Sequence, residues 1–275
     1  MGVARWLAAA TTVAAACRTA DPPREAPRPT GQVIKVAVIG GMIETGFWQA
    51  LAERYQAARG NRIEVVATGP KPEVVAAFRR GGIDLVTVHA CDAMINLVAD
   101  GLARDPQPWA RNDLVIVGPV ADPAGVRGER DAARALERIV AARAPLLVHA
   151  SLGADGVLHD LQEAGHVALD PGATVLFGDD NQHRVVARAA ELSAYTLIGR
   201  IPWLTGKLRA DGVALMVQGD PRLRRPYLVE VSPAAGPAAA DLAAYLRAPE
   251  TQQWIATFGR GRYDDQSLFF PVSVL

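Results

Sequence analysis

The residues best suited to chemistry in this sequence follow predicted strands, and they are Met42, Glu44, His89, Cys91 and His149. Thioether, thiolate and imidazole groups together suit a soft or borderline metal such as copper or zinc. However, none of these residues belongs to a close ligand pair such as C-x-x-C or H-x-x-x-H. We therefore favour a structural interpretation, in which His89 makes a local hydrogen bond and Cys91 is a small buried side chain. We expect no metal and no cofactor.

A second group of polar residues is the run DDNQH at residues 179–183. Its carboxylates could bind a cationic or hydroxylated ligand. Alternatively, Asp180 could cap a helix whose dipole favours acidic residues, and both interpretations can hold together. Arg200 is also open to two interpretations, because it could contact a ligand or pin one part of the fold through a carboxylate.

The sequence gives no support for catalysis. Ser151 has no base or orienting acid at a recognisable spacing. The glycines of VIGGMIETG lack the G-x-G-x-x-G spacing of a dinucleotide-binding turn. We therefore expect a protein that is not an enzyme.

The balance of charges argues against some classes of binding partner. The chain has 275 residues, with 29 Lys and Arg against 29 Asp and Glu, so its formal net charge is zero. Such a chain has no electrostatic footprint for nucleic acid or for an anionic membrane surface. Its length allows one large domain or two modest ones. Only Lys35, Lys71 and Lys207 are lysines, which we attribute to genome composition.

The N-terminus is typical of an exported protein. Residues 1–16 combine Arg5, a short apolar run and a small-residue cleavage site, which predicts a signal peptide. Cys17 follows directly, so lipid anchoring through Cys17 and plain secretion both remain open. Residues 17–32 form a Pro-rich tether that cannot pack. We expect the protein in the periplasm or on the exterior of the cell envelope, with Cys91 too isolated to form a disulfide.

From residue 33 onward, strand-like and helix-like segments alternate, which predicts a parallel α/β sheet. Apolar runs such as VIKVAVI and LVIVG are typical of strands covered on both faces. We expect strands at residues 33–39, 62–67, 83–89, 114–118, 145–149, 174–177, 195–198, 213–217 and 227–231. We expect helices after residue 41 and at residues 72–80, 92–100, 129–143, 153–163, 181–192, 202–209, 238–246 and 249–258.

This pattern predicts two lobes. Residues 33–117 and 226–275 would form lobe 1, and residues 118–225 would form lobe 2. Open α/β sheets bind ligands beyond the carboxyl ends of their strands, where helix N-termini point outward. A ligand cleft should therefore lie between the lobes, at the loops that follow the strands.

Five segments carry a resemblance to a known family: IDLVTVHACDA, RNDLVIVGPVADPAGVRG, AYTLIGR, QGDPRLRRPYLVEVSP and TFGRGRYDDQSLFFP. In this order they resemble the tungstate-binding proteins of ABC importers. The resemblance implies a two-lobed clamp of the type II periplasmic binding-protein fold, with central mostly parallel sheets. It also implies an extracytoplasmic solute-binding protein whose partners are a small solute and an ABC permease in the inner membrane. We expect a monomer that binds no nucleic acid.

The ligand loops depart from the family's pattern. Family members have a run of Thr and Ser after the first strand, and an Arg with a Ser-Gly-Thr turn at the start of the second lobe. Here the first place is Gly40-Gly41-Met42, only Thr45 keeps a hydroxyl, and Ala154 replaces the second-lobe Thr. A buried dianion must be met by charge or by several hydrogen-bond donors. We therefore predict weak tungstate binding and a cleft shifted toward negative potential by added carboxylates.

The predicted ligand site consists of ten residues, Gly41, Met42, Glu44, Thr45, His89, Cys91, His149, Ser151, Asp180 and Arg200. Its ligand would be an oxyanion or, given the lost Arg and hydroxyls, another small solute. The alternative function is a periplasmic metal-handling or accessory binding protein that serves no importer, which the Met, Cys and His residues motivate.

Overall fold

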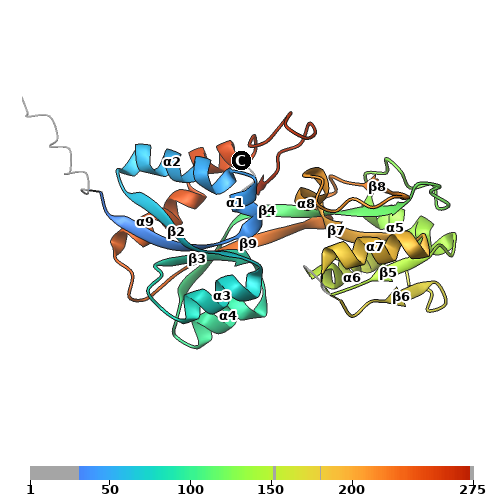
Figure 1. Cartoon of the computed structure of the whole chain (residues 1–275), viewed down its shortest axis with the longest axis horizontal. Helices are drawn as coiled ribbons and strands as arrows, with labels where there is room; N and C mark the ends of the chain where they lie inside the picture. Colours follow the sequence, from blue (N-terminus) through green and yellow to red (C-terminus); the bar gives the residue numbers. More distant parts are fainter. Residues whose placement is uncertain (1–30, 151–152, 180, 273–275) are drawn as a thin grey trace, which may run out of the picture.

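The computed structural model describes residues 31–150, 153–179 and 181–272, which form two lobes side by side (Figure 1). The predicted signal peptide, Cys17 and the tether up to residue 30 lie outside the described residues. Within the described part of the chain, no helix is both long and apolar enough to cross a membrane.

Lobe 1 is built on one sheet with helices against both of its faces. Its elements are β1 (Val33–Ile39), α1 (Gly40–Glu44), α2 (Phe47–Arg59), β2 (Arg62–Gly69), α3 (Lys71–Arg79), β3 (Leu85–His89), α4 (Asp92–Ala99), β4 (Arg104–Pro119), β9 (Arg224–Val231), α9 (Pro237–Arg247), α10 (Pro249–Ile255) and β10 (Phe270–Pro271). The strand order is β10-β4-β9-β3-β1-β2. β1 pairs in parallel with β2 and β3, as the alternation of strands and helices predicted.

Lobe 2 repeats the same architecture on a smaller scale. Its elements are α5 (Ala132–Ala141), β5 (Leu146–Val148), α6 (Ala154–Gly165), β6 (Thr174–Leu176), α7 (Gln182–Leu192), β7 (Thr196–Gly199), α8 (Arg200–Leu204), β8 (Val213–Val217) and a short 3₁₀ helix (Pro221–Leu223). β5 and β6 pair in parallel, whereas β7 and β8 both run antiparallel to β4. Parallel pairing is thus found among the strands that alternate with helices, and antiparallel pairing around the strands that connect the lobes.

β4 is much longer than the strand expected at residues 114–118, because it begins at Arg104. The added stretch contains Pro106 and Pro108. Proline has no N–H to donate to a neighbouring strand, so it argues against a central strand. The structure accommodates the prolines because the pairing with β9 shifts register after Arg104 and again after Pro108. Such irregularities let a chain stay in a sheet where regular pairing would fail.

β4 and β9 connect the two lobes (Figure 1). Up to Asp113, β4 pairs with β9, and from Leu114 onward it pairs with β7. The pairing partner therefore changes a few residues before the predicted boundary between residues 117 and 118. The assignment of residues 33–117 and 226–275 to one lobe remains a proposal.

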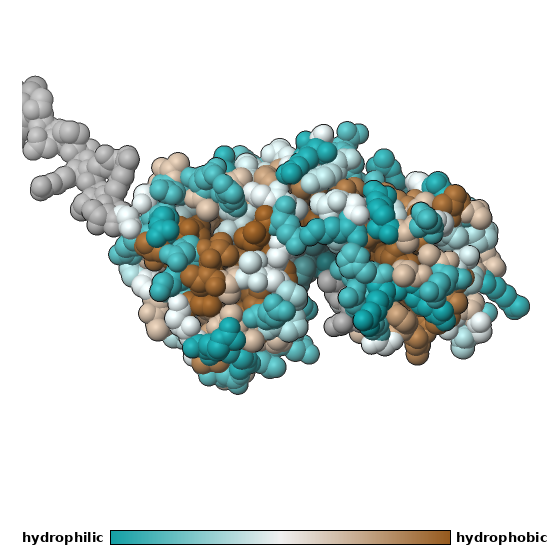
Figure 2. Space-filling view, viewed as in Figure 1, coloured by the Kyte–Doolittle hydropathy of each residue, from teal (hydrophilic) through white to brown (hydrophobic). Residues whose placement is uncertain are grey.

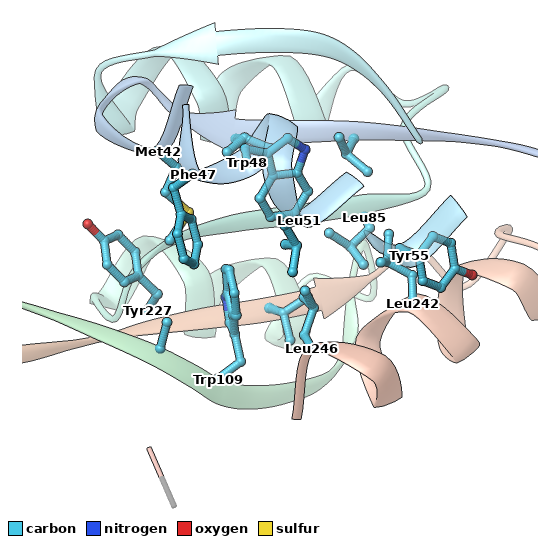
Figure 3. Close-up of a cluster of buried hydrophobic side chains, with 14 of the residues drawn as sticks. Met42, Phe47, Trp48, Leu51, Tyr55, Leu85, Trp109, Tyr227, Leu242 and Leu246 are labelled. Atoms are coloured by element: carbon cyan, nitrogen blue, oxygen red, sulfur yellow. The ribbon is translucent and has the colours of Figure 1, made fainter. Parts of the chain in front are cut away.

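Each lobe has its own hydrophobic core. In lobe 1, Phe47, Leu51 and Tyr55 form one face of α2 and are fully buried between the sheet and α9 (Figure 3). The Phe47 ring stacks on Phe269 with 4.1 Å between the ring centroids. In lobe 2, α5 and α6 pack together through Leu136, Ile139, Leu158 and Leu161. A further cluster in each lobe packs elsewhere, around Phe78 and Leu97 in lobe 1 and around Val185 and Trp203 in lobe 2.

Candidate ligand-binding cleft

A cavity of about 630 Å³ lies between the lobes. The space-filling view shows the molecule hollowed between them, on the side that carries α3 and α4 (Figure 2). Lobe 1 contributes the ends of β1 and β3 and the start of α3, and lobe 2 contributes the loop after β5, the start of α7 and the segment around α8. The lining residues are Ile39, Pro70, Lys71, Pro72, His89, Ala150, Asn181, Gln182, His183, Pro202, Lys207 and Leu208. The cavity thus lies where an open α/β sheet binds its ligand.

Two lysines give the cavity wall positive charge. Lys71 begins α3 in lobe 1 and Lys207 follows α8, although the whole chain has only three lysines. The start of α7 adds a helix N-terminus, which favours anions by its dipole. One backbone N–H there is already used, because the Asn181 side chain accepts a hydrogen bond from His183 N at 3.0 Å.

Two carboxylates near the cavity, those of Glu44 and Asp179, are paired with cations, and the expected shift of the cleft toward negative potential stays a prediction because Asp180 lies outside the described residues. Glu44 pairs with Lys207 at 2.6 Å, and both side chains are about half exposed. Asp179 pairs with Arg184 at 2.8 Å. Lys71 has no such partner among the ion pairs of the described chain and keeps its charge facing the cavity.

His89, the last residue of β3, is a predicted site residue that lines the cavity. Its Nε2 lies 2.9 Å from Asn112 Oδ1, and its ring packs against Tyr227 with 4.1 Å between centroids. Only 8% of the residue is exposed. Burial, followed by the positive charge of Arg225, holds the pKa of His89 well below its ordinary value. The imidazole is therefore neutral at neutral pH.

The buried Arg225 contacts the hydrogen-bond partner of His89. Arg225 donates from Nη2 to Asn112 Oδ1 at 3.1 Å, and Asn112 and Arg225 are cross-strand partners in β4 and β9. Burial lowers the pKa of Arg225 to about 10, so the guanidinium stays charged at neutral pH. One asparagine oxygen thus joins the arginine to the histidine.

The segment that directly follows β1 forms the short helix α1. Met42 is fully buried in the lobe 1 core (Figure 3). The Thr45 hydroxyl donates to the carbonyl oxygen of Gly41 at 2.9 Å. The side chains of Met42 and Thr45 are therefore engaged inside lobe 1, and Glu44 is the residue of this group that reaches toward lobe 2.

Cys91 and His149 do not share a site. Cys91 is a half-buried free thiol at the start of α4. His149 is 3% exposed, and its Nε2 donates to the Leu197 carbonyl oxygen at 2.7 Å. Burial lowers the pKa of His149. Across residues 31–150, 153–179 and 181–272, no three His, Cys, Asp or Glu side chains gather closely enough to hold a metal ion.

Arg200 is fully buried at the start of α8 and tied into the fold. Its Nη2 donates to both carboxylate oxygens of Asp264, at 2.7 and 2.8 Å, and its Nη1 donates to the Ser267 carbonyl oxygen at 2.9 Å. Its Nη1 also lies 3.6 Å from Asp113, whose pKa burial raises to about 6. Of the two interpretations from the sequence, this geometry matches the one in which Arg200 pins part of the fold.

Two predicted site residues, Ser151 and Asp180, lie outside the described residues. Four residues at or directly behind the cavity were not predicted from the sequence, namely Lys71, Lys207, Asn112 and Arg225. The scarcity of lysine was an available signal, because Lys71 directly precedes the helix predicted at residues 72–80 and Lys207 lies within the helix predicted at residues 202–209.

Comparison with known proteins places this geometry in a family. The chain matches the bacterial extracellular solute-binding proteins over residues 34–260. It is 28% identical over 261 residues to a Haloferax volcanii protein whose name describes an ABC transporter anion-binding protein, covering 87% of this chain and 72% of that protein. It is 26% identical over 257 residues to the tungstate-binding protein TupA of Peptoclostridium acidaminophilum, covering 86% and 87%.

Solved structures show the same fold. The tungstate-binding protein TupA of Desulfovibrio alaskensis is 24% identical with a TM-score of 0.69, over 89% of this chain and 100% of that chain. The tungstate ABC transporter protein of Geobacter sulfurreducens is 24% identical with a TM-score of 0.62, over 82% and 98%. The predicted α/β clamp of the type II periplasmic binding-protein fold is confirmed. The chain belongs to the family of bacterial extracellular solute-binding proteins and resembles the tungstate receptors of ABC transporters.

Proposed function

We propose that this protein is the receptor of an ABC importer and binds a small oxyanion in the cavity between its lobes. The observation that carries the proposal is the placement of Lys71 and Lys207 on the wall of that cavity. A buried anion needs opposite charge or several donors to offset its lost hydration. The names of the relatives, anion-binding and tungstate-binding, support the same class of ligand.

Binding would close the lobes around the ligand. The cavity of about 630 Å³ is far larger than a tetrahedral oxyanion. Hinges commonly lie at a few residues where strands pass from one domain to another. The connecting strands change partners at Asp113 and Leu114, which makes this the expected hinge. Closure would bring Lys71 and Lys207 nearer to one ligand.

Tungstate should bind more weakly than the resemblance implies. The Thr45 hydroxyl is bonded within α1, and Arg200 is held by Asp264, so neither group is free to bind the anion without breaking a contact. A hydrogen bond to a charged group contributes about 1.5–3 kcal/mol. Two such losses lower affinity by roughly a hundredfold or more, since about 1.4 kcal/mol corresponds to tenfold.

The remaining parts of the proposal follow from this role. The protein would act outside the cytoplasm as a monomer without enzymatic activity, deliver its solute to a permease in the inner membrane, and bind no nucleic acid. Its relatives are solute-binding proteins. A lipid anchor on Cys17 remains an alternative to free secretion, and mass spectrometry of the protein from cell envelopes would distinguish them.

A thermal-shift screen of the protein against oxyanions, divalent metals and small metabolites tests the proposal. An oxyanion at about a hundred times its dissociation constant should stabilise the protein by about 2.7 kcal/mol. Stabilisation by a divalent metal alone would contradict the proposal and favour a metal-handling protein.

A further inference from the structure

The hydrogen bonds around His89 fix which of its ring nitrogens carries a proton. An arginine can only donate hydrogen bonds, so the Asn112 atom that Arg225 contacts must be the amide oxygen. The same oxygen lies 2.9 Å from His89 Nε2 and therefore accepts a hydrogen from it. Nε2 of His89 thus carries the proton in every protonation state of this arrangement.

The second ring nitrogen of His89 is then an acceptor. In a neutral imidazole with a proton on Nε2, Nδ1 carries a lone pair. Nδ1 makes no hydrogen bond to any described residue, and His89 is one of the residues that line the cavity. A ligand in the cavity therefore meets an acceptor on His89, next to the positive charges of Lys71 and Lys207.

The surroundings of His89 keep it neutral. Arg225 and Tyr227 of β9 and Asn112 of β4 contact the ring or its hydrogen-bond partner, and Lys71 faces it from α3. His183 and Lys207 line the cavity from the side of lobe 2. Glu44 is paired with Lys207, and the charged groups of the described chain that act on His89 are Arg225 and Lys71, so a second proton on His89 would add a cation beside two cations.

We infer that His89 accepts a hydrogen bond at Nδ1 from the hydroxyl of the bound oxyanion. The receptor therefore selects oxyanions that carry a proton, such as hydrogenphosphate, over fully deprotonated ones, such as sulfate and tungstate. A fully deprotonated oxygen would face the Nδ1 lone pair with no hydrogen between them. The inference rests on the proposed oxyanion-binding function and adds the chemical class of the ligand.

Calorimetric titration of the protein with phosphate, sulfate and tungstate at about pH 8, in buffers of different ionisation enthalpy, tests the inference. We expect phosphate to bind at least a hundredfold more tightly, up to the roughly ten-thousandfold that sites built around a ligand hydroxyl reach. Phosphate should bind without proton uptake. Any binding of sulfate or tungstate should take up about one proton and strengthen about tenfold per unit of falling pH.

The possible outcomes distinguish a failure of this inference from a failure of the proposed oxyanion-binding function. Sulfate or tungstate binding as tight as phosphate binding, without proton uptake, would overturn the inference and leave the oxyanion receptor in place. Absence of binding to every anion would overturn the proposed function itself.

The variant His89→Gln tests whether this side chain is the selecting group. Its amide can donate as well as accept, so it can serve both kinds of oxyanion, and the preference for phosphate over tungstate should be lost. His159→Gln is the matched control, because His159 is exposed on α6 and pairs with Glu163. Equal losses for both anions would show a purely structural role for His89 and overturn the inference. If the variant does not fold, the proton-uptake measurement on the unaltered protein still decides.

Discussion

His89 and His149 each stand at the carboxyl end of a buried strand, one in each lobe, and each uses Nε2 in a hydrogen bond inside the protein. Their second nitrogens differ. Nδ1 of His149 is buried without a partner among the described residues, in a region closed by α6 and β7. His89 lines the large cavity instead. Both histidines therefore lie at the end of a strand. Whether each can contact a ligand depends on the elements packed around its ring.

The groups behind the two histidines differ as well. In lobe 1, the charged Arg225 and His89 both donate a hydrogen bond to the side-chain oxygen of Asn112. Lobe 2 bonds His149 directly to the neutral backbone of β7. We therefore expect His89 to act on ligand binding and His149 to act on stability. The following predictions test this division, beginning with the buried contact between Arg200 and Asp264.

Replacing Arg200 by alanine should have the largest effect. Arg200 is fully buried and joins α8 to Asp264 of the C-terminal segment. Removing one partner of a buried ion pair costs about 3–5 kcal/mol, because the remaining charge is left buried. Urea denaturation measures the free energy of unfolding. Arg188→Ala is the control, since Arg188 forms an exposed pair with Glu191 that should contribute about 0–1 kcal/mol. Similar values for both variants would contradict the prediction.

Lys71→Ala and Lys207→Ala test whether both lobes supply charge to the ligand. Each variant should weaken oxyanion binding by roughly tenfold to a hundredfold, since a hydrogen bond to a charged group contributes about 1.5–3 kcal/mol. Calorimetric titration with phosphate measures the change. Lys35→Ala is the matched control, because Lys35 is exposed on β1 and does not line the cavity. An effect of only one of the two variants would place the ligand against one lobe.

His149→Gln should lower stability by about 1–3 kcal/mol at neutral pH without changing oxyanion affinity, because it disturbs a buried hydrogen bond. The variant should also change the pH dependence. The pKa of His149 is lowered from 6.5 in the folded state, so its contribution is present above 6.5 and is lost as pH falls below that value. Thermal unfolding from neutral to acidic pH measures this, and a variant with an unchanged acid slope would argue against it.

Glu44→Gln should have the smallest effect and the opposite sign. Glu44 pairs with Lys207 at 2.6 Å, so its carboxylate competes with a bound anion for that lysine. Both side chains are about half exposed, and exposed pairs contribute only about 0.2–1 kcal/mol. Oxyanion affinity should rise by up to a few-fold in calorimetric titration. Glu53→Gln, on an exposed face of α2, is the control. Weaker binding by Glu44→Gln would show that Glu44 takes part in holding the ligand.

Local patterns predicted most of the elements, and the differences have local causes. The apolar run at Val33–Ile39 became β1 with the same bounds. The first half of β4 was missed because Pro106 and Pro108 argue against a central strand, and only the pairing with β9 shows how the sheet accommodates them. The pair Gly40-Gly41 suggested a turn, yet α1 begins there because its one buried side chain, Met42, packs into the lobe 1 core.

The candidate site was predictable in place and less so in composition. The rule that ligands bind beyond the carboxyl ends of strands led to His89, which lines the cavity. The same rule led to Met42, whose side chain turns into the core. It could not find Lys207, which lies after α8 and reaches the cavity because the second lobe faces the first. A loop's position does not determine the direction of its side chains.

The sequence by itself determined the α/β class and the balance of charge, because each depends on residue types and on spacing within one segment. The tertiary structure alone decided that Arg225, Asn112 and His89 form one chain of hydrogen bonds. These residues belong to β9, β4 and β3, and they meet through the register of strands that are far apart in the sequence. A shift of one residue in a strand turns every side chain to the opposite face. The irregular pairing that sets this register around the prolines of β4 arises only in the assembled sheet.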